Sequence, residues 1–390
     1  MDIRRIRGAL LKACLLIGSV CLGLVAIEGG ARLYVAVAKP QLGDYYAFMK
    51  SSPPPYRDAG FYSTAYVDEF IDDGGYHTPP GTRLVIPNDR QGEYINIREG
   101  RRHTSYQPAV AEITVYVLGG STILSREVPD DQTIPSHLQR LLRDHPDESY
   151  RVENLGVISV NSRQQLERLK TLELRRGDIV LFYDGVNEIY HSLYFNKPEG
   201  WTVEDHARDR AALPWQRRWI LDLYDGLYHK SSFVTHFLDP YDSDTVPPHL
   251  RDRPTLDRLL VELEQSYVET ITEANRFCAE RGVEFHHFLQ PNLFTVDDRS
   301  EYEESLLASS HFTASGVDIG FVEGYPVLRY AVGRLASSGI SSTDLSAVLD
   351  ERAEGEEYYL DFCHVNHRAN HAVAESIASV AFTPERIASR

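Results

Sequence analysis

The sequence ITVYVLGGS at residues 113–121 joins a run of β-branched, aromatic and aliphatic residues to two glycines and a serine. An apolar run of this length without polar alternation is typical of a strand that is buried on both faces of a parallel sheet. The glycines permit a tight turn where the strand ends. We therefore expect a strand over residues 113–118, with Ser121 directly after its carboxyl end.

The same pattern recurs along the chain. Further strands are expected at residues 150–155, 178–183 and 283–289, and helices are expected near Pro135, around residues 166–172, over residues 255–281 and around residues 373–380. Strands that alternate with helices predict a parallel sheet covered on both faces. In such sheets the functional site lies at the carboxyl ends of the strands.

Three residues have the chemistry of a nucleophilic site. A serine hydroxyl is a weak nucleophile at neutral pH and needs an adjacent base, which in turn needs an orienting carboxylate. Asp361 and His364 are three residues apart, just before the final helix. On a turn this spacing lets the carboxylate reach one imidazole nitrogen, so that the other faces Ser121. We predict that Ser121, His364 and Asp361 are nucleophile, base and orienting acid.

An acyl-transfer site also needs hydrogen-bond donors where negative charge develops on the substrate oxygen. Gly156 follows the second expected strand, and Asn187 follows the third. We predict an oxyanion hole made of the backbone N–H groups of Ser121 and Gly156 and the side-chain amide of Asn187.

Four short blocks carry a resemblance to a known family. They read GGST at residues 119–122, NLG at 154–156, GVNE at 185–188 and DFCH at 361–364. In this order, and at these places in a strand–helix pattern, they resemble the SGNH (GDSL-like) hydrolases over about residues 112–382. The resemblance implies a three-layer α/β/α sandwich with a five-stranded parallel sheet. It also implies cleavage or transfer of acyl groups without a metal or cofactor, and the residue roles given above.

The chain departs from the family pattern at two positions. Gly120 and Glu188 stand where many members have aspartate. Neither position is one of the predicted functional residues, and the two departures indicate a divergent subgroup.

Other interpretations of these motifs remain open. The glycine-rich turn at residues 119–121 is also compatible with a phosphate-binding loop, although no lysine of a P-loop follows it. His367 and His371 continue the row begun by His364 and are interpreted as solvated helix positions rather than a metal face. Cys363 beside the predicted base is interpreted as a packing residue.

The segment 190–254 is an aromatic-rich insertion between the third strand and the long helix. It contains Trp201, Trp215 and Trp219, which we treat as candidate substrate-binding residues. Aromatic rings of this kind stack on sugars, line acyl pockets or lie on membrane surfaces. A helical subdomain with its own small core is the alternative.

The N-terminus has the character of a membrane-targeting segment. Four basic residues among the first 12 precede the uncharged run Ala13–Ile27, which is shorter than the roughly 20 residues of a full span. The positive charge predicts a cytoplasmic N-terminus and an extracytoplasmic body. We expect a retained signal anchor over residues 1–38, then a linker and β-rich lead-in over 39–110 and a hydrolase domain over 111–390. A cleaved signal peptide, which would release a secreted protein, is the alternative.

Composition narrows the class of protein. The net charge of −17 over 390 residues argues against a nucleic-acid partner, because phosphate binding needs a basic surface. The four cysteines form no CxxC motif, and the sequence is compatible with a disulfide between Cys278 and Cys363 as well as with free cysteines.

These observations predict a membrane-anchored serine esterase or acylhydrolase that acts on a small-molecule or glycan ester, with O-acyl groups of cell-envelope glycans as one substrate class. Three alternatives remain, namely an O-acyltransferase of polysaccharide modification, a lipid-directed acylhydrolase and a non-catalytic glycan-binding or assembly module.

Overall fold

The computed structural model describes residues 3–38, 49, 52–72, 74–143, 149–227, 246–308, 316–352 and 355–383. The chain divides into two compact units, one formed by Met1–Ser52 with Arg210–Ser243 and the other by Pro53–Asp209 with Asp244–Arg390. The second unit contains the sheet and all of the residues of the four blocks. The two units are described separately below.

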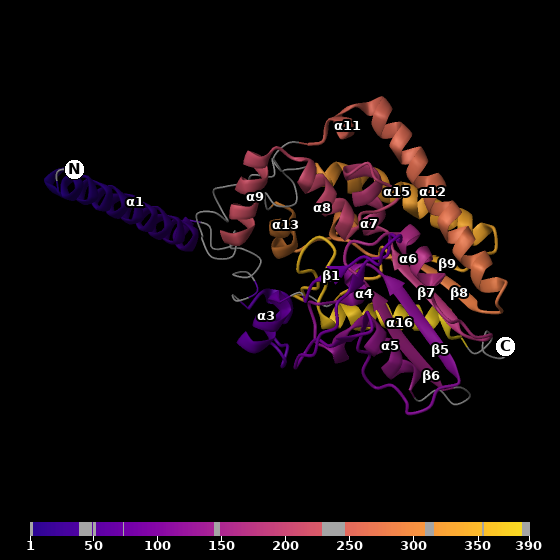
Figure 1. Cartoon of the computed structure of the whole chain (residues 1–390). Coiled ribbons are helices and arrows are strands. Elements are labelled where there is room, and N and C mark those ends of the chain that lie inside the picture. Colours follow the sequence, from indigo (N-terminus) through magenta and orange to yellow (C-terminus); the bar gives the residue numbers. More distant parts are fainter. Residues whose placement is uncertain are drawn as a thin grey trace. The chain divides into compact units, whose positions relative to one another are not determined.

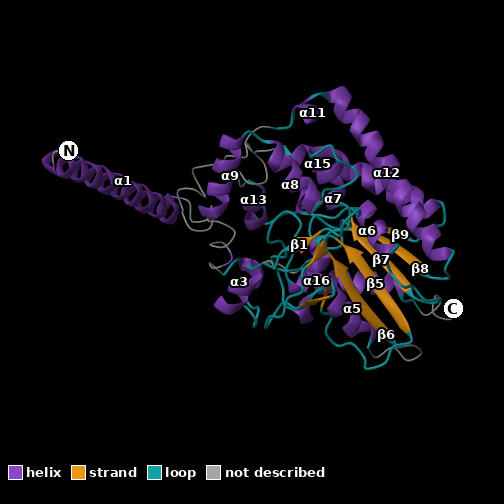
Figure 2. Cartoon of the chain, viewed as in Figure 1, coloured by secondary structure: helices purple, strands orange, loops and turns teal. Residues whose placement is uncertain are grey.

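A seven-stranded sheet in the order β3-β4-β6-β5-β7-β8-β9 forms the centre of the larger unit (Figures 1 and 2). Its five strands from β6 to β9 run parallel, which confirms the predicted five-stranded parallel sheet. The parallel strands are β5 (Ile113–Gly119), β6 (Tyr150–Gly156), β7 (Ile179–Asp184), β8 (Glu284–Leu289) and β9 (Ser342–Asp344). The interior of β5 and all of β7 are buried, as the unbroken apolar runs of the sequence predict.

Two short strands of the lead-in, which the sequence analysis expected to be β-rich, extend this sheet. β3 (Ile97–Arg98) and β4 (Arg101–Arg102) form an antiparallel hairpin, and β4 pairs with β6 through Arg102 and Asn154. A separate antiparallel pair is formed by β1 (Tyr76–His77) and β2 (Ile86–Pro87). Each of these strands has two residues, too few to show a periodic pattern in the sequence.

Helices cover the two faces of the parallel strands (Figure 1). Strand β5 lies between β6 and β7, so the connection from β5 to β6 and the connection from β6 to β7 run in opposite directions along the sheet. Because both crossovers are right-handed, they place α5 and α6 on opposite faces of the sheet. α16 packs against α5, and α12 packs against both α6 and α15. The helices of these layers are α5 (Ile134–Leu142), α6 (Ser162–Leu169), α12 (Arg253–Ala279), α15 (Val317–Ser337) and α16 (His367–Ala381).

Shorter helices lie in the lead-in, at the carboxyl ends of the strands and in the insertion. They are η1 (Pro54–Tyr56), α3 (Thr64–Ile71), α4 (Ser121–Leu124), η2 (Asp130–Gln132), α7 (Val186–Glu188), η3 (Ile189–Tyr194), α8 (Val203–Ala212), α11 (Pro248–Arg251), η4 (Leu293–Thr295) and α13 (Glu301–Leu307).

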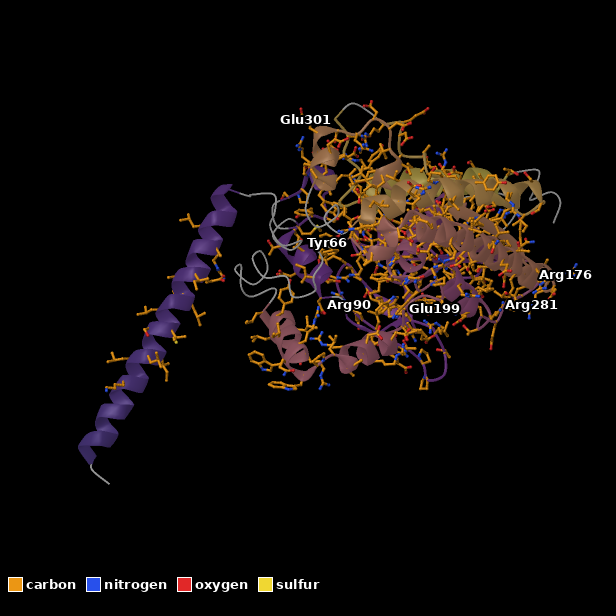
Figure 3. The ribbon with its side chains drawn as sticks, turned by 90° about the horizontal axis from the view of Figure 1, so that it is seen from above. Tyr66, Arg90, Arg176, Glu199, Arg281 and Glu301 are labelled. Carbon is orange, nitrogen blue, oxygen red and sulfur yellow. The ribbon has the colours of Figure 1, made fainter. Side chains whose placement is uncertain are left out.

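Charged residues lie at the amino ends of the parallel strands. α12 ends at Ala279, and the turn through Glu280 and Gly282 leads into the first residue of β8. Arg176 and Arg281 lie together at this end of the molecule (Figure 3). This edge is formed by the amino ends of the strands and therefore lies across the sheet from Ser121.

The lead-in before β5 packs into the larger unit. The side chain of Arg102 is fully buried and donates to the carbonyl oxygens of Leu124 (2.7 Å), Ser125 and Val128 (2.6 Å) and to the Asp130 carboxylate (3.0 Å). One arginine therefore fixes most of the loop that follows α4.

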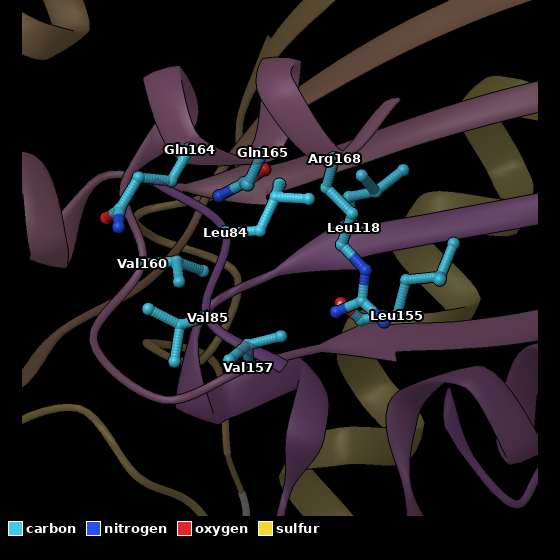
Figure 4. Close-up of a pocket in the computed structure, with 9 residues that line it drawn as sticks. All are labelled: Leu84, Val85, Leu118, Leu155, Val157, Val160, Gln164, Gln165 and Arg168. Carbon is cyan, nitrogen blue, oxygen red and sulfur yellow. Dashed lines mark hydrogen bonds between the residues drawn. The ribbon is translucent and has the colours of Figure 1, made fainter. Parts of the chain in front are cut away.

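A small cavity of about 10 Å³ lies between the lead-in, β5, β6 and α6 (Figure 4). The buried Gln165 amide borders it and has no hydrogen-bond partner among the described residues. This volume is near the lower bound for one water molecule, so the cavity suits a structural water rather than a substrate.

The smaller unit contains α1 (Ile3–Ala38) and α9 (Trp215–Leu227). Within α1, the 19 residues Leu15–Leu33 are long and apolar enough to cross a membrane, although a signal sequence has the same features. Glu28 pairs with Arg32 one helical turn away at 2.7 Å, so the two charges inside this stretch offset each other. The apolar stretch therefore continues to Leu33, beyond the end of the uncharged run at Ile27.

Candidate active site

Ser121, His364 and Asp361 meet at the carboxyl edge of the parallel sheet. The His364 Nε2 atom lies 2.8 Å from Ser121 Oγ, and His364 Nδ1 lies 2.6 Å from Asp361 Oδ2. These are hydrogen-bond distances in a continuous Ser–His–Asp chain. The structure thus brings together the three residues that the sequence analysis selected from segments 240 residues apart.

The local backbone explains why Ser121 faces this edge. Gly120 is extended and caps α4, so the chain turns sharply between β5 and the helix, and Ser121 occupies the first helical position. A side chain at Gly119 would lie 2.8 Å from the carbonyl oxygen of Tyr183 on the neighbouring strand. Glycine is therefore required where β5 passes close to β7.

The turn that carries His364 is held by its own aspartate. Asp361 Oδ1 accepts hydrogen bonds from the backbone N–H groups of Cys363 (2.8 Å) and His364 (2.7 Å). Its other oxygen accepts from the imidazole. Asp361 is buried, and these three donors fix both of its oxygens. The Asp-x-x-His spacing therefore positions the base and the turn together.

Electrostatics at the site make His364 a stronger base and keep Asp361 ionised. Burial raises the pKa of Asp361, but the positive charge of His364 and the hydrogen bonds it receives outweigh burial and leave that pKa below its usual value. Burial lowers the pKa of His364, but the negative charge of Asp361, with a smaller contribution from that of Glu127, raises it well above its usual value. The imidazole is therefore a strong proton acceptor for Ser121.

Asn187 lies beside the nucleophile turn. Its Nδ2 atom donates to the Val160 carbonyl at 2.8 Å and would lie 2.5 Å from a Cβ atom placed on Gly120. The absence of a side chain at residue 120 therefore leaves room for the amide next to Ser121. One of the two Asn187 amide hydrogens is used by Val160, and the second is left for a ligand.

Gly156 does not offer its N–H group to this edge. That group donates to Asn154 Oδ1 at 2.9 Å, and the Gly156 Cα atom packs against the backbone of α4, where an added Cβ would lie 2.0 Å from Leu124 N. The glycine is needed for close packing of β6 against α4. The structure therefore does not place Gly156 with Ser121 and Asn187.

The loop after β6 comes closer to Asn187. It includes Val160, which accepts from Asn187, and the exposed Ser159, which has a left-handed backbone with φ 52°. The buried ring of His191 lies 2.8 Å from the Ser159 carbonyl oxygen and fixes this peptide. Ser159 N–H has no acceptor among the described residues. Nothing in the sequence indicates that a serine would adopt this backbone.

Glu188 joins the two loops beneath the site. Its carboxylate accepts hydrogen bonds from the backbone N–H groups of Ser162 and Gly185, the second at 2.8 Å. Burial, reinforced by the negative charge of Asp184, raises the pKa of Glu188 to about 8. Where the family pattern has aspartate, this longer acid therefore spans from the Asn187 turn to the start of α6.

Glu127 is a site residue that the sequence analysis missed. It lies in the loop after α4, its carboxylate is 3.9 Å from His364 Nε2, and its side chain is only 9% exposed. It approaches the end of the imidazole that faces Ser121, not the end held by Asp361. No strand end or motif marks this position in the sequence.

Asp361, Cys363 and His364 form a cluster whose ligand atoms lie within 4.8 Å of one another. Both imidazole nitrogens are already engaged, one by Asp361 and the other by Ser121. Burial raises the pKa of the Cys363 thiol to about 12, so it is protonated and a poor metal ligand near neutral pH. The donor set does not fit a resident metal.

The other residues considered in the sequence lie apart from the triad contacts. His367 packs edge-on to Phe61, and His371 packs edge-on to His137. Cys278 is buried and free in α12, and Cys363 is also free, so the two cysteines form no disulfide in this structure.

The tryptophans differ in their surroundings. Trp201, in the larger unit, has Lys197 over its ring at 3.8 Å and packs against Phe195. Trp215 and Trp219 lie on α9 in the smaller unit and are 67% and 61% exposed. The aromatic residues at 228–245 of the predicted insertion lie outside the described residues.

No family model and no curated protein matches the chain, but several solved structures are similar to it. A member of the lipolytic G-D-S-L family from Veillonella parvula matches at 10% identity and a TM-score of 0.37, covering 70% of this chain and 99% of that one. Axe2, an acetylxylan esterase from Geobacillus stearothermophilus, matches at 12% identity and a TM-score of 0.37, covering 70% and 95%. The chain is similar to G-D-S-L-type esterases. At these low values the similarity assigns no role to any residue, and the roles below rest on contacts within this chain.

Proposed function

We propose that this protein is a serine ester hydrolase that forms an acyl-enzyme on Ser121. The observation that carries the proposal is the unbroken hydrogen-bonded chain from Ser121 through His364 to Asp361 at the carboxyl edge of a parallel sheet. Ser121 and His364 are partly exposed, so an ester can reach them, whereas Asp361 is buried where it orients the base.

In the proposed mechanism Ser121 Oγ attacks the ester carbonyl carbon while its proton passes to His364 Nε2. Asp361 stabilises the imidazolium that forms. The tetrahedral intermediate collapses, the C–O bond to the alcohol breaks, and the alcohol leaves with the proton from Nε2. Water then attacks the acyl-enzyme and gives a proton to Nε2. The carboxylic acid departs, and the proton returns to Ser121.

The oxyanion of the intermediate needs preorganised donors. We assign the backbone N–H of Ser121 and the free amide hydrogen of Asn187 to this role. Ser121 N–H lies at the start of α4 and has no acceptor among the described residues. The third donor in our proposal is Ser159 N–H instead of Gly156 N–H, because the latter already donates to Asn154.

We further propose that α1 anchors the enzyme in a membrane and that its substrates are O-acyl groups of cell-envelope glycans. The apolar stretch Leu15–Leu33 supports the first part, and the basic residues before it support an extracytoplasmic site. A sugar hydroxyl that replaced water in the second step would make the same site an acyltransferase.

The test uses the full-length chain in detergent, as wild type and as Ser121→Ala. Both are incubated with p-nitrophenyl acetate, butyrate and a long-chain ester, and with a fluorophosphonate probe. We expect turnover and labelling of the wild type and neither in the variant. A folded wild type that takes no probe would rule out the serine mechanism. Probe labelling with ester turnover only after addition of a sugar acceptor would favour the acyltransferase.

A further inference from the structure

Glu127 is a mostly buried residue whose carboxylate makes no hydrogen bond to another side chain or backbone group in the part of the chain that the structure describes. Glu127 is 7% exposed, and no lysine, arginine or hydrogen-bond donor contacts its side-chain oxygens among the residues that the structure describes. Buried charged groups are costly unless donors satisfy them. Among the described residues, the basic group nearest to the carboxylate is His364, whose Nε2 atom is 3.9 Å away and so beyond hydrogen-bond distance. The carboxylate therefore retains acceptor capacity that points toward the reacting end of the base.

The loop that carries Glu127 is rigidly built. Arg102 holds the carbonyl oxygens before and after it, and the Tyr56 hydroxyl donates to the carbonyl oxygen of Glu127 itself. The Tyr66 hydroxyl donates to the Arg126 carbonyl oxygen at 3.3 Å. Three side chains of the lead-in thus fix the backbone on both sides of Glu127. A residue held so firmly is preorganised for a ligand.

The position of the carboxylate identifies which half of an ester it meets. In the reaction that we propose, the alcohol oxygen accepts its proton from His364 Nε2, so this oxygen lies next to Nε2. Glu127 is next to the same atom, on the side away from Asp361. Neighbouring hydroxyl oxygens of a diol or sugar ring are about a hydrogen-bond length apart. A hydroxyl beside the ester-bearing carbon can therefore donate to Glu127.

We infer that Glu127 is a specificity-determining residue that accepts a hydrogen bond from a hydroxyl next to the ester in the alcohol half of the substrate, so that the enzyme selects esters of vicinal diols and sugars. This inference rests on the proposed function. A substrate without such a donor leaves the carboxylate free to attract the imidazolium that forms during attack, which draws the Nε2 proton away from the leaving oxygen. The same residue thus favours polyol esters and disfavours simple ones.

A pair of substrates that differ by one hydroxyl tests this inference. Cyclohexyl acetate and cis-cyclohexane-1,2-diol monoacetate are compared on the full-length enzyme. Hydrogen bonds to charged groups are worth enough to change kcat/KM by about 10- to 100-fold. We expect the wild type to prefer the diol ester by this factor. Glu127→Gln should reduce the preference to within about threefold, mainly by loss of activity on the diol ester, because the amide presents a weaker acceptor.

Matched variants separate the specific effect from loss of charge or of folding. Glu280→Gln removes one acid at the opposite edge of the sheet and should leave the substrate preference unchanged. Glu127→Asp keeps the charge on a shorter side chain and should retain part of the preference. An equal loss of activity on both esters in Glu127→Gln would show a purely electrostatic effect on His364 and would overturn the inference. A further comparison uses acetylcholine and its neutral analogue 3,3-dimethylbutyl acetate. If the wild type preferred acetylcholine by a larger factor than it prefers the diol ester over cyclohexyl acetate, the inference would be overturned in favour of a substrate with a cationic alcohol.

A binding measurement keeps this inference distinct from the proposed function. In Ser121→Ala, which cannot form the acyl-enzyme, the diol monoacetate should shift the NMR signals of the His364 ring. The double variant with Glu127→Gln should lose this shift. Binding by Ser121→Ala without any turnover by the wild type would contradict the esterase and keep the hydroxyl site. Turnover without diol preference or binding would contradict the hydroxyl site and keep the esterase.

Discussion

Replacing Asp361 by asparagine changes one atom and tests the orientation of the base. In the wild type, Asp361 Oδ1 accepts from the N–H groups of Cys363 and His364, and Oδ2 accepts from the imidazole. An asparagine that keeps both backbone donors must place its oxygen at the Oδ1 position. Its NH₂ group then faces His364 Nδ1, which must present a lone pair, so the ring proton moves to Nε2. The base can then no longer accept the proton of Ser121.

The expected magnitude follows from loss of the correct tautomer and of the charge that stabilises the imidazolium. Together they cost about 10³- to 10⁴-fold in kcat, or roughly 4–5.5 kcal/mol in the activation free energy. The His364 pKa is raised in the wild type chiefly by Asp361, against the lowering effect of burial. Activity needs the neutral imidazole, so the acid limb of the residual activity should move to lower pH in Asp361→Asn.

The assay is the pH profile of kcat/KM for p-nitrophenyl acetate, with burst kinetics to follow acylation. Cys363→Ala is the control, because its buried thiol lies 3.7 Å from the same nitrogen and carries no charge near neutral pH. The control should stay within a few-fold of the wild type. If Asp361→Asn kept more than a tenth of the activity, with an unchanged acid limb, Asp361 would not orient the base.

Three further predictions concern the surroundings of the triad. Because burial raises the pKa of Glu188 from 4.5 to about 8, its contribution to stability is fully present below about pH 4.5 and is lost as pH rises through about 8. Urea unfolding should therefore show the wild type losing stability over this window relative to Glu188→Gln, by on the order of 1 kcal/mol per pH unit, and parallel curves would contradict the raised pKa. Arg102→Met should lower the free energy of unfolding by about 3–5 kcal/mol, because it leaves the buried Asp130 carboxylate without its positively charged partner. The same variant should be labelled more slowly by the fluorophosphonate probe. Unchanged labelling despite this loss of stability would show that the active site does not depend on the loop. Trp215 and Trp219 share an exposed face of α9. In a variant that lacks residues 1–38, replacing both tryptophans with alanine should reduce binding to anionic vesicles. Equal binding with and without the two tryptophans would exclude this face from membrane contact.

The sequence was sufficient to predict the parallel sheet and the meeting of Ser121, His364 and Asp361. Long buried strands carry unbroken apolar runs, and residues that follow such strands must converge on one edge. The predicted helix over residues 255–281 corresponds to α12, because a 27-residue helix repeats its apolar stripe many times. Each of these features is favoured by many residues at once, so it can be recognised in the sequence pattern.

The structural features that the sequence did not predict depend on single contacts, which leave no pattern in the sequence. β9 has three residues, two of them polar and one acidic, and pairs with β8 only because the fold places it there. Gly156 follows a strand, as an oxyanion donor would, but its N–H group turns toward Asn154 two residues before it. Glu127 reaches His364 because Arg102, from a distant hairpin, folds the loop around it. Such long-range side-chain contacts leave no local periodicity.

The way in which the lead-in supports the loop after α4 limits how this protein can be shortened. A fragment that began at the first long strand would look complete by sequence, since it would hold every residue of the four blocks. It would lack Tyr56, Tyr66 and Arg102, and the carbonyl oxygens that they satisfy around residues 124–128 would have to find water or rearrange. A soluble version of the enzyme should therefore retain every residue from Pro53 onward.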